Sequence, residues 1–93
     1  MSFVYILRCA DGTFYVGHTD DVLARVAAHN DGVGANYTAA RRPVHLVYSE
    51  ACGSKAAALA RERQLKRWSG KKKEALAAGD SSLLHVLSRR RRR

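Results

Sequence analysis

The sequence predicts an α+β fold: a small three-stranded antiparallel sheet flanked by helices, in the order β-β-α-β-α-α-α. Two runs rich in β-branched and aromatic residues meet at an Asp-Gly pair near the N-terminus, and a third such run follows the single proline. The other segments with a regular apolar period have helical spacing. The chain has 93 residues with an apolar share of 46%, so we expect one compact domain over residues 1–88.

The chain opens with a predicted β-hairpin. Phe3–Cys9 and Thr13–His18 are rich in strand-forming residues, and Asp11-Gly12 lies between them. Asp-Gly between apolar runs favours a type I′ turn, which needs positive φ at both central positions. A helix over residues 20–30 follows, with capping residues at its start and Asp31-Gly32 at its end.

The middle of the chain changes from loop to strand at the proline. Gly32–Arg42 contains two glycines and no clear period, which predicts a loop. Val44–Ser49 alternates in the manner of a half-buried strand. This alternation puts Val44, Leu46 and Tyr48 on one face of the sheet.

Three helical segments fill the rest of the chain. Gly53-Ser54 offers an N-cap to an alanine-rich helix over Lys55–Trp68, and Ser69-Gly70 ends that helix. Shorter helices are expected over Lys71–Ala78 and over Ser81–Arg89.

The charge balance indicates a polyanionic partner. Seventeen Lys and Arg against eight Asp and Glu give a formal net charge of +9, and such a surplus attracts nucleic acid. Arg89–Arg93 supply five of these charges, so we expect a flexible basic tail that binds unspecifically, beside a domain body of net charge +4.

The sequence shows no feature of membrane insertion or export. It has no run of about eighteen apolar residues, and its apolar N-terminus lacks a basic region and a small-residue cleavage site. We therefore expect a cytoplasmic protein in a reducing compartment, with no membrane partner. Cys9 and Cys52 are expected to be buried thiols, because two cysteines at this spacing form neither a disulfide framework nor a zinc site.

Arg25 and His29 are the first candidate functional pair. On the predicted helix they are about 40° apart, and they flank the apolar stripe that includes Val22 and Val26. Both should therefore lie at the rim of the sheet. A guanidinium can hold phosphate oxygens and an imidazole can move protons near neutral pH. An exposed polar pair on an ordinary surface helix is the open alternative.

Glu62 is the more informative position. Leu59 and Leu65 lie three residues to either side of it, so its carboxylate falls within the stripe that should face the core. A buried carboxylate needs a cation, and the spacing leaves two possibilities open: Lys66, four residues on, or a metal ion. Because most other acids lie in turns or at helix starts, we favour a site with one protein carboxylate and several waters, as Mg²⁺ often has.

Tyr5 and Tyr15 are expected to come close together on the two strands of the hairpin. Packing at the edge of the core is the alternative role for both rings. Gly17, two residues after Tyr15, indicates either the close approach of another group, such as a ligand backbone, or a bulge.

These residues together resemble a known family. Val4-Tyr5-Ile6 and Tyr15-Val16-Gly17 resemble the two halves of the GIY-YIG motif, although a valine in each half departs from its letters. Arg25-x-x-x-His29, and later Ala58-Leu59-x-x-Glu62-x-x-Leu65-Lys66, resemble the rest of that superfamily's signature. The resemblance covers residues 3–77 and is greatest to stand-alone bacterial domains of the YhbQ or UPF type, which resemble the catalytic module of Slx-type nucleases.

The resemblance implies an endonuclease that hydrolyses DNA phosphodiester bonds with one Mg²⁺ or Mn²⁺ ion, in DNA repair or recombination. It implies that Glu62 is the metal ligand and that Arg25 contacts the scissile phosphate. Tyr5 would be the general base toward the attacking water, and Tyr15 would orient phosphate or water.

Two histidines complete the implied catalytic set. His18 stands where many members have a lysine or another residue that assists proton movement. His29 matches a histidine found in some branches. Many members also have an asparagine near the end of the domain, whereas this sequence has none after Asn36.

The expected partner is therefore DNA, including branched or single-strand-containing forms, and the sequence sets no oligomeric state. Two other functions stay open: a non-catalytic nucleic-acid-binding module, and a protein-interaction domain whose basic tail binds an acidic partner. The expected nucleic-acid-binding residues are Gly17, Arg41, Arg42, Lys66, Arg67, Lys71 and Lys72.

Overall fold

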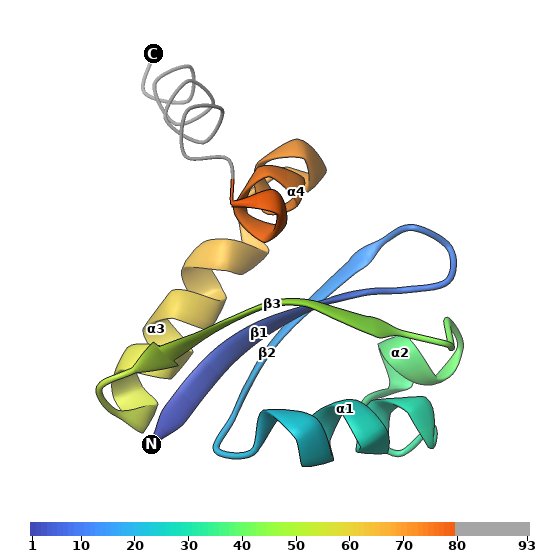
Figure 1. The fold of residues 1–93 in the computed structure, drawn as a ribbon, viewed down its shortest axis with the longest axis horizontal. Helices are drawn as coiled ribbons and strands as arrows, with labels where there is room; N and C mark the ends of the chain where they lie inside the picture. Colours follow the sequence, from blue (N-terminus) through green and yellow to red (C-terminus); the bar gives the residue numbers. More distant parts are fainter. Residues whose placement is uncertain (80–93) are drawn as a thin grey trace.

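The computed structural model describes residues 1–79, which form a three-stranded antiparallel sheet with helices on both sides (Figure 1). The predicted fold class is confirmed. The elements are β1 (Ser2–Arg8), β2 (Phe14–Thr19), α1 (Val22–Asn30), α2 (Asn36–Ala39), β3 (His45–Cys52), α3 (Lys55–Lys66) and α4 (Gly70–Ala78). Strand β1 lies between β2 and β3, and both neighbours are antiparallel to it. In Figure 1, α1 and α2 lie on one side of the sheet and α3 and α4 on the other.

The predicted hairpin is present, but its turn differs from the expected type. Within the turn, Gly12 has a positive φ of 85° and Asp11 does not. The amide of Gly12 donates to the Cys9 carbonyl at 2.9 Å, and the Cys9 amide donates to the Thr13 carbonyl at 2.8 Å. The loop therefore has three residues with glycine in the left-handed position. Asp11 avoids that conformation and instead accepts hydrogen bonds from the Thr13 amide and hydroxyl at 3.1 and 2.6 Å.

Strand β3 contains a bulge that the alternation of its sequence does not reveal. Ile6 pairs with Tyr48 and Leu7 pairs with Leu46, so Val47 is an extra residue on β3. The prediction that Val44, Leu46 and Tyr48 share a face is therefore wrong. Val44 packs on the α1 side of the sheet, Tyr48 packs on the α3 side, and Leu46 is 37% exposed.

The helices begin at the residues that capping chemistry favours. Asp21 and Ser54 accept hydrogen bonds from the amides three residues later, at the starts of α1 and α3. The segment predicted as a loop over Gly32–Arg42 contains the short helix α2. Apart from α2, the predicted order is confirmed as far as residue 79. The helix predicted over Ser81–Arg89 and the arginine tail lie outside the described residues.

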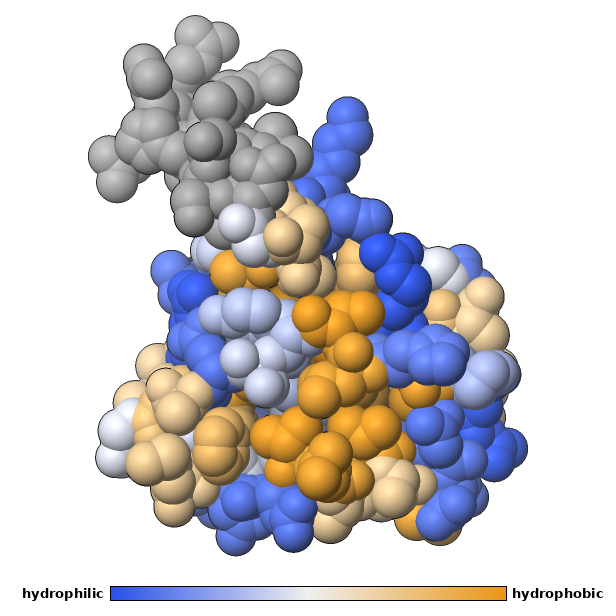
Figure 2. Space-filling model, in the orientation of Figure 1, coloured by the Kyte–Doolittle hydropathy of each residue, from blue (hydrophilic) through white to orange (hydrophobic). Residues whose placement is uncertain are grey.

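The sheet separates two apolar clusters. Val4, Ile6 and Val16 point toward Leu65 of α3. Alternate residues of the same strands pack toward Val26 of α1 on the opposite face, and the central members of that cluster include Tyr5. In the view of Figure 2, hydrophobic side chains form a band across the middle of the molecule, with hydrophilic side chains on both sides of it. Within residues 1–79, no helix has the length and apolar character needed to cross a bilayer.

Candidate active site

A hollow opens where β2 ends and where α1 and α3 begin. Two of the predicted catalytic residues, His18 and Arg25, line it. The acid Asp20 and the base Lys55 line it as well, although neither was among the predicted site residues. The complete lining is Ser2, His18, Thr19, Asp20, Arg25 and Lys55.

Arg25 is positioned to receive an anion. Its side chain is exposed on α1, and it forms no ion pair with a carboxylate of residues 1–79. Arg8, Arg41 and Arg61, in contrast, each pair with an acid of the domain. A guanidinium that faces a hollow without an acidic partner is suited to binding phosphate oxygens.

Glu62 lies behind His18 and is held by two cationic or hydrogen-bonding partners. His18 Nδ1 is 2.5 Å from Glu62 Oε1, and Lys66 Nζ is 2.6 Å from Glu62 Oε2. The Glu62 side chain is only 13% exposed. Burial acts to raise the pKa of its carboxyl, but the hydrogen bonds and charges of Lys66 and His18 outweigh burial and leave the pKa lowered. The intrahelical Glu62–Lys66 pair that the spacing left open is therefore formed.

The chemistry of this carboxylate fits a divalent cation. The lowered pKa keeps Glu62 ionised at neutral pH. Lys66 is 52% exposed, so its ammonium group can move into solvent and free one carboxylate oxygen. No group of three or more His, Cys, Asp or Glu that could hold a metal occurs in the described part of the chain. Glu62 would then hold an ion together with waters, which is a common arrangement for Mg²⁺.

Tyr5 and His29 form a buried pair on the opposite face of the sheet. The Tyr5 hydroxyl is 2.8 Å from His29 Nε2, and His29 Nδ1 is 2.7 Å from the Thr38 hydroxyl. That hydroxyl donates its own proton to the Ala35 carbonyl at 3.1 Å, so it must accept from His29. We therefore assign the tautomer with the proton on Nδ1, and Tyr5 donates to Nε2.

The placement of His29 differs from the prediction. Both Arg25 and His29 were expected at the rim of the sheet, but His29 is completely buried and only Arg25 is exposed. Helix α1, which carries His29, packs against α2, and the Thr38 hydroxyl of α2 accepts the Nδ1 proton of His29. Burial lowers the pKa of His29, and the charge of Arg25 lowers it further. The imidazole is consequently neutral at neutral pH.

Two glycines make room for the Tyr5–His29 pair. A β-carbon on Gly17 would lie 2.5 Å from the Tyr5 hydroxyl oxygen, and one on Gly34 would lie 2.4 Å from His29 Nδ1. The close approach predicted for Gly17 is thus present, and the approaching group is the ring of Tyr5. The β1–β2 register explains this contact, because Tyr5 and Gly17 are directly opposite each other.

The two motif tyrosines lie close together but differ in access to solvent. Their ring centroids are 6.4 Å apart, whereas Tyr5 is 1% exposed and Tyr15 is half-buried. Burial raises the pKa of Tyr5, and the neighbouring Arg25 opposes that rise. The Tyr15 hydroxyl has no hydrogen bond to residues 1–79, and no side-chain oxygen of that region is buried without a partner. Tyr15 therefore presents its hydroxyl to solvent.

The sheet thus divides the predicted catalytic residues between its two faces. His18 is opposite Val4 in the β1–β2 ladder and points with it toward α3, where Glu62 lies. Tyr5, Tyr15 and His29 lie on the α1 face. The hollow forms where the faces meet at the end of β2, an edge strand, and Arg25 reaches both the hollow and Tyr5.

The predicted nucleic-acid-binding residues have different surroundings. Arg41 pairs with Asp11 at 3.1 Å, and its guanidinium lies 3.8 Å from the centre of the Tyr37 ring. Arg42 donates to the Ala39 carbonyl at 2.9 Å. Lys66 pairs with Glu62, as described above. Lys72 is only 6% exposed, Arg67 and Lys71 are exposed, and Gly17 is buried beneath Tyr5.

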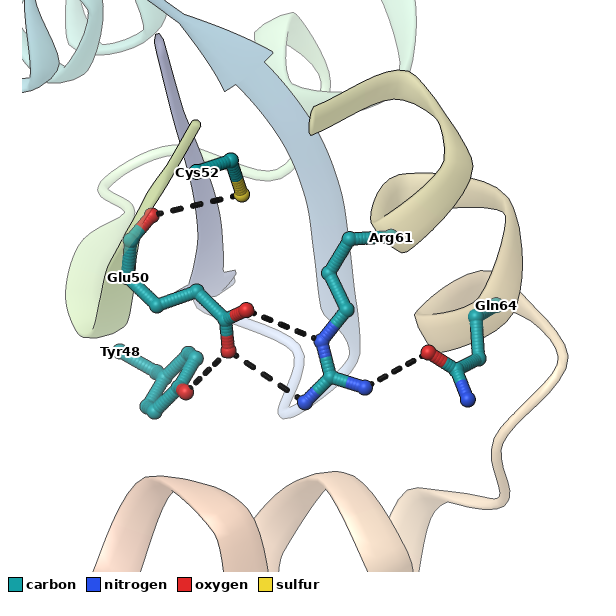
Figure 3. A network of polar contacts seen from close by, with 5 residues as sticks. All are labelled: Tyr48, Glu50, Cys52, Arg61 and Gln64. Carbon is teal, nitrogen blue, oxygen red and sulfur yellow. Dashed lines mark hydrogen bonds and ion pairs between the residues drawn. The ribbon is translucent and has the colours of Figure 1, made fainter. Parts of the chain in front are cut away.

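A polar network on the α3 side holds this helix against the sheet (Figure 3). Arg61 Nε donates to Glu50 Oε2 at 3.1 Å, and Arg61 Nη1 donates to Gln64 at 2.7 Å. The Tyr48 hydroxyl also donates to Glu50. Arg61 is adjacent in sequence to Glu62, so this network helps to fix the turn of α3 that carries the site carboxylate.

Sequence reasoning missed three residues of this region: Thr38, Lys55 and Asp20. Thr38 lies in a segment without a clear period, and its contact with His29 depends on the unexpected helix α2. Lys55 starts α3 far from the hairpin in sequence, so only the folded chain brings it to the hollow. The run Thr19-Asp20-Asp21 indicated an N-cap, and in the structure Asp21 is that cap. Because the run was interpreted only as a cap, Asp20 was not recognised as a residue of the hollow.

Comparisons with known proteins relate this chain to a family of catalytic domains. Residues 1–75 match the family model of the GIY-YIG catalytic domain. UPF0213 proteins of Staphylococcus aureus strains Mu3 and Mu50 are each 54% identical over 71 residues, which cover 76% of this chain and 87% of theirs. The solution NMR structure of a UPF0213 protein from Bacillus halodurans is 43% identical, has a TM-score of 0.54 and covers 86% of each chain.

Proposed function

This chain belongs to the GIY-YIG catalytic domain family, and on that premise we propose that it is a metal-dependent endonuclease that hydrolyses DNA phosphodiester bonds. The observation that supports this most is the hollow at the end of β2. It combines an arginine without an acidic partner with a histidine whose Nδ1 is bound to an ionised carboxylate. DNA repair or recombination, where strands must be cut internally, is the proposed role.

Arg25 and Glu62 would each contribute to stabilising the negative charge of the phosphate, Arg25 directly and Glu62 through a bound cation. A phosphodiester is already anionic, so attack by water needs positive charge near the phosphoryl oxygens. Arg25 would supply part of it through paired hydrogen bonds. Glu62 would hold Mg²⁺ or Mn²⁺ after Lys66 turns into solvent. When bound, such an ion polarises the phosphoryl group and lowers the pKa of a coordinated water.

His18 is the group best placed to accept the proton of the attacking water. The Glu62 carboxylate accepts a hydrogen bond, so Nδ1 of His18 carries the proton in this pair. Nε2 is then the ring's acceptor, and His18 lines the hollow. As water attacks phosphorus, its O–H bond breaks and an N–H bond forms at Nε2, while the ester bond to the leaving oxygen breaks.

Tyr5 remains a second candidate for the base, because its hydrogen bond to His29 offers a different proton path. Tyr5 could accept the proton of water as its own proton moves to His29 Nε2, 2.8 Å away. Its burial means that the neighbouring side chains must open before water reaches the hydroxyl. Tyr15, whose hydroxyl faces solvent, is proposed to orient water or phosphate.

Nicking of supercoiled plasmid tests the proposal. The wild-type chain should nick plasmid with Mg²⁺ or Mn²⁺, EDTA should abolish nicking, and Glu62→Gln should lower the rate by at least about a hundredfold, as the loss of a main electrostatic group does elsewhere. Glu74→Gln, which removes the same charge from an exposed residue of α4, should cut normally. His18→Gln and Tyr5→Phe then distinguish the two candidate general bases, because only the variant that lacks the general base should lose cleavage.

The competing function is a non-catalytic module that binds nucleic acid through its basic residues. It predicts salt-sensitive binding with no cleavage of plasmid, forked or four-way-junction DNA at any metal concentration. That outcome, with folded protein and intact binding, would replace the nuclease proposal. A protein-interaction role predicts instead no measurable DNA affinity at physiological salt once Arg89–Arg93 are removed.

A further inference from the structure

A second hollow lies at the junction of α3 and α4, apart from the candidate active site. Its lining contains three cationic side chains, one amide, one indole and one alanine, and no carboxylate. These residues are Ala60, Arg63, Gln64, Arg67, Trp68 and Lys72. A concave surface lined only by cationic and neutral groups attracts anions.

Trp68 forms a fixed wall of this second hollow. Its ring packs against the cluster that contains Leu65. Lys72 Nζ lies 4.1 Å from the ring centre and the Arg61 guanidinium lies 5.3 Å from it, which are cation–π distances. Lys72 is 6% exposed, so its ammonium is held in place at the edge of the hollow. Arg63 is exposed and pairs with no carboxylate of residues 1–79.

One side of α3 connects the two hollows. At about 100° per residue, Lys55, Lys66 and Arg63 fall within about 80° of arc, and Arg67 lies about 40° further round. Lys55 lines the first hollow, and Arg63 and Arg67 line the second. Lys66 is further along the helix than Arg63, beside Glu62. Basic side chains therefore occur on one side of α3 at the first hollow and again at the second hollow.

The separation of the two hollows along α3 fits the spacing of a nucleic-acid backbone. Gln64, near the middle of the second hollow's lining, is nine residues after Lys55. That separation is about 14 Å along the axis at about 1.5 Å per residue. Successive phosphates of a strand rise by about 3.4 Å along a duplex, so the distance corresponds to about four base steps.

From these observations we infer that the α3–α4 hollow binds a backbone phosphate of the DNA substrate about four base steps from a phosphate that lies beside Lys55 in the first hollow. This inference rests on the proposed function and adds a length requirement to it. A substrate needs a double-stranded arm that extends along α3, and an arm too short to reach the α3–α4 hollow loses the phosphate contact there. Arg63 and Arg67 supply the charge, while Trp68 and Lys72 shape the hollow.

Binding without cleavage tests the inference. Fluorescence anisotropy in EDTA would measure the affinity of labelled DNA hairpins with arms from about three to ten base pairs, over a series of salt concentrations. The wild-type chain should bind the longer arms more tightly, with the step near four base pairs. Arg63→Gln/Arg67→Gln should weaken binding of long arms about tenfold, reduce the salt slope by about one per lost contact, and remove the step.

Matched variants separate the effect of residues that line the hollow from the effect of net positive charge on DNA binding. Lys73→Gln removes a positive charge from a half-buried residue of α4 that does not line the hollow, and should leave the length step intact. Arg63→Lys should restore most of the affinity that Arg63→Gln loses. Thermal melting of each variant confirms that it is folded.

Three results would overturn the inference: a double variant that keeps the length step, equal losses for short and long arms, or equal effects of Arg63→Gln and Lys73→Gln. Displacement of long arms by a polyglutamate peptide, but not by unlabelled DNA, would assign the hollow to an acidic protein instead. Because no cleavage is measured, these outcomes are independent of the plasmid test. If the chain cuts plasmid but its DNA binding shows no length step, only the phosphate contact at the α3–α4 hollow is refuted, and the proposed nuclease function stands.

Discussion

At the scale of single residues, the most informative side chain is His29. Its Nδ1 proton goes to Thr38 and its Nε2 accepts from Tyr5, so both ring nitrogens are satisfied only in the neutral form. A positive charge there would be buried, with Arg25 nearby to repel it. The histidine of the R-x-x-x-H pattern therefore orders the first motif tyrosine.

This arrangement predicts how stability depends on pH. Burial lowers the pKa of His29 in the folded chain below the 6.5 of an exposed histidine, so as pH falls the unfolded chain takes up this proton first. The contribution is complete above about pH 6.5 and is lost progressively below it. His29→Gln should be less stable at pH 7.5 by about 1–3 kcal/mol, because Tyr5 loses its partner, but should lose less on acidification.

Urea unfolding between pH 7.5 and 5 measures this difference. His45→Gln, at an exposed position of β3, is the matched control and should retain the wild-type decline. Parallel curves for His29→Gln and the wild-type chain would show that His29 is not held neutral by the fold.

At the scale of elements, the orientation of α3 decides where Glu62 lies. Arg61 bridges Glu50 of β3 and Gln64 of its own helix, on the turn next to Glu62. Arg61→Gln should lower the free energy of unfolding by about 1–2 kcal/mol through the loss of charge-assisted hydrogen bonds. It should also slow the cleavage proposed above, since α3 would pack less firmly against β3.

Chemical denaturation and plasmid nicking on the same samples check this prediction. For the denaturation measurement, Arg63→Gln is the control, because it changes an exposed residue of the same helix and should alter stability by less than about 0.5 kcal/mol. Equal stabilities of the two variants would mean that the Glu50–Arg61 contact does not hold α3.

Most helices and strands could be predicted from the sequence, because a capping or turn residue acts on the element next to it in the chain. Asp21 and Ser54 cap the helices that follow them, and Gly12 provides the turn of the hairpin. Two features were not predictable for the opposite reason. The bulge at Val47 depends on pairing with β1, and α2 is stabilised by contacts with α1 rather than by an apolar period.

At the scale of the whole molecule, the motif residues could be listed from the sequence but not placed on faces. Alternation along β2 puts Gly17 with Tyr5 and puts His18 on the other side with Glu62. Which face each helix covers is a tertiary property, so the sequence could not show that the sheet divides the site. The pairing of Glu62 with Lys66, left open by spacing, was likewise decided only by the fold.

The proposed cleavage depends most on a divalent cation that binds at Glu62, beside His18 and Arg25. Amide NMR spectra recorded during a titration with substoichiometric Mn²⁺ test this directly, because paramagnetic broadening decreases steeply with distance from the ion. We expect broadening centred on residues 17–19 and 61–63, and its loss in Glu62→Gln. Broadening centred on another acid such as Glu50, or unchanged in Glu62→Gln, would contradict the claim.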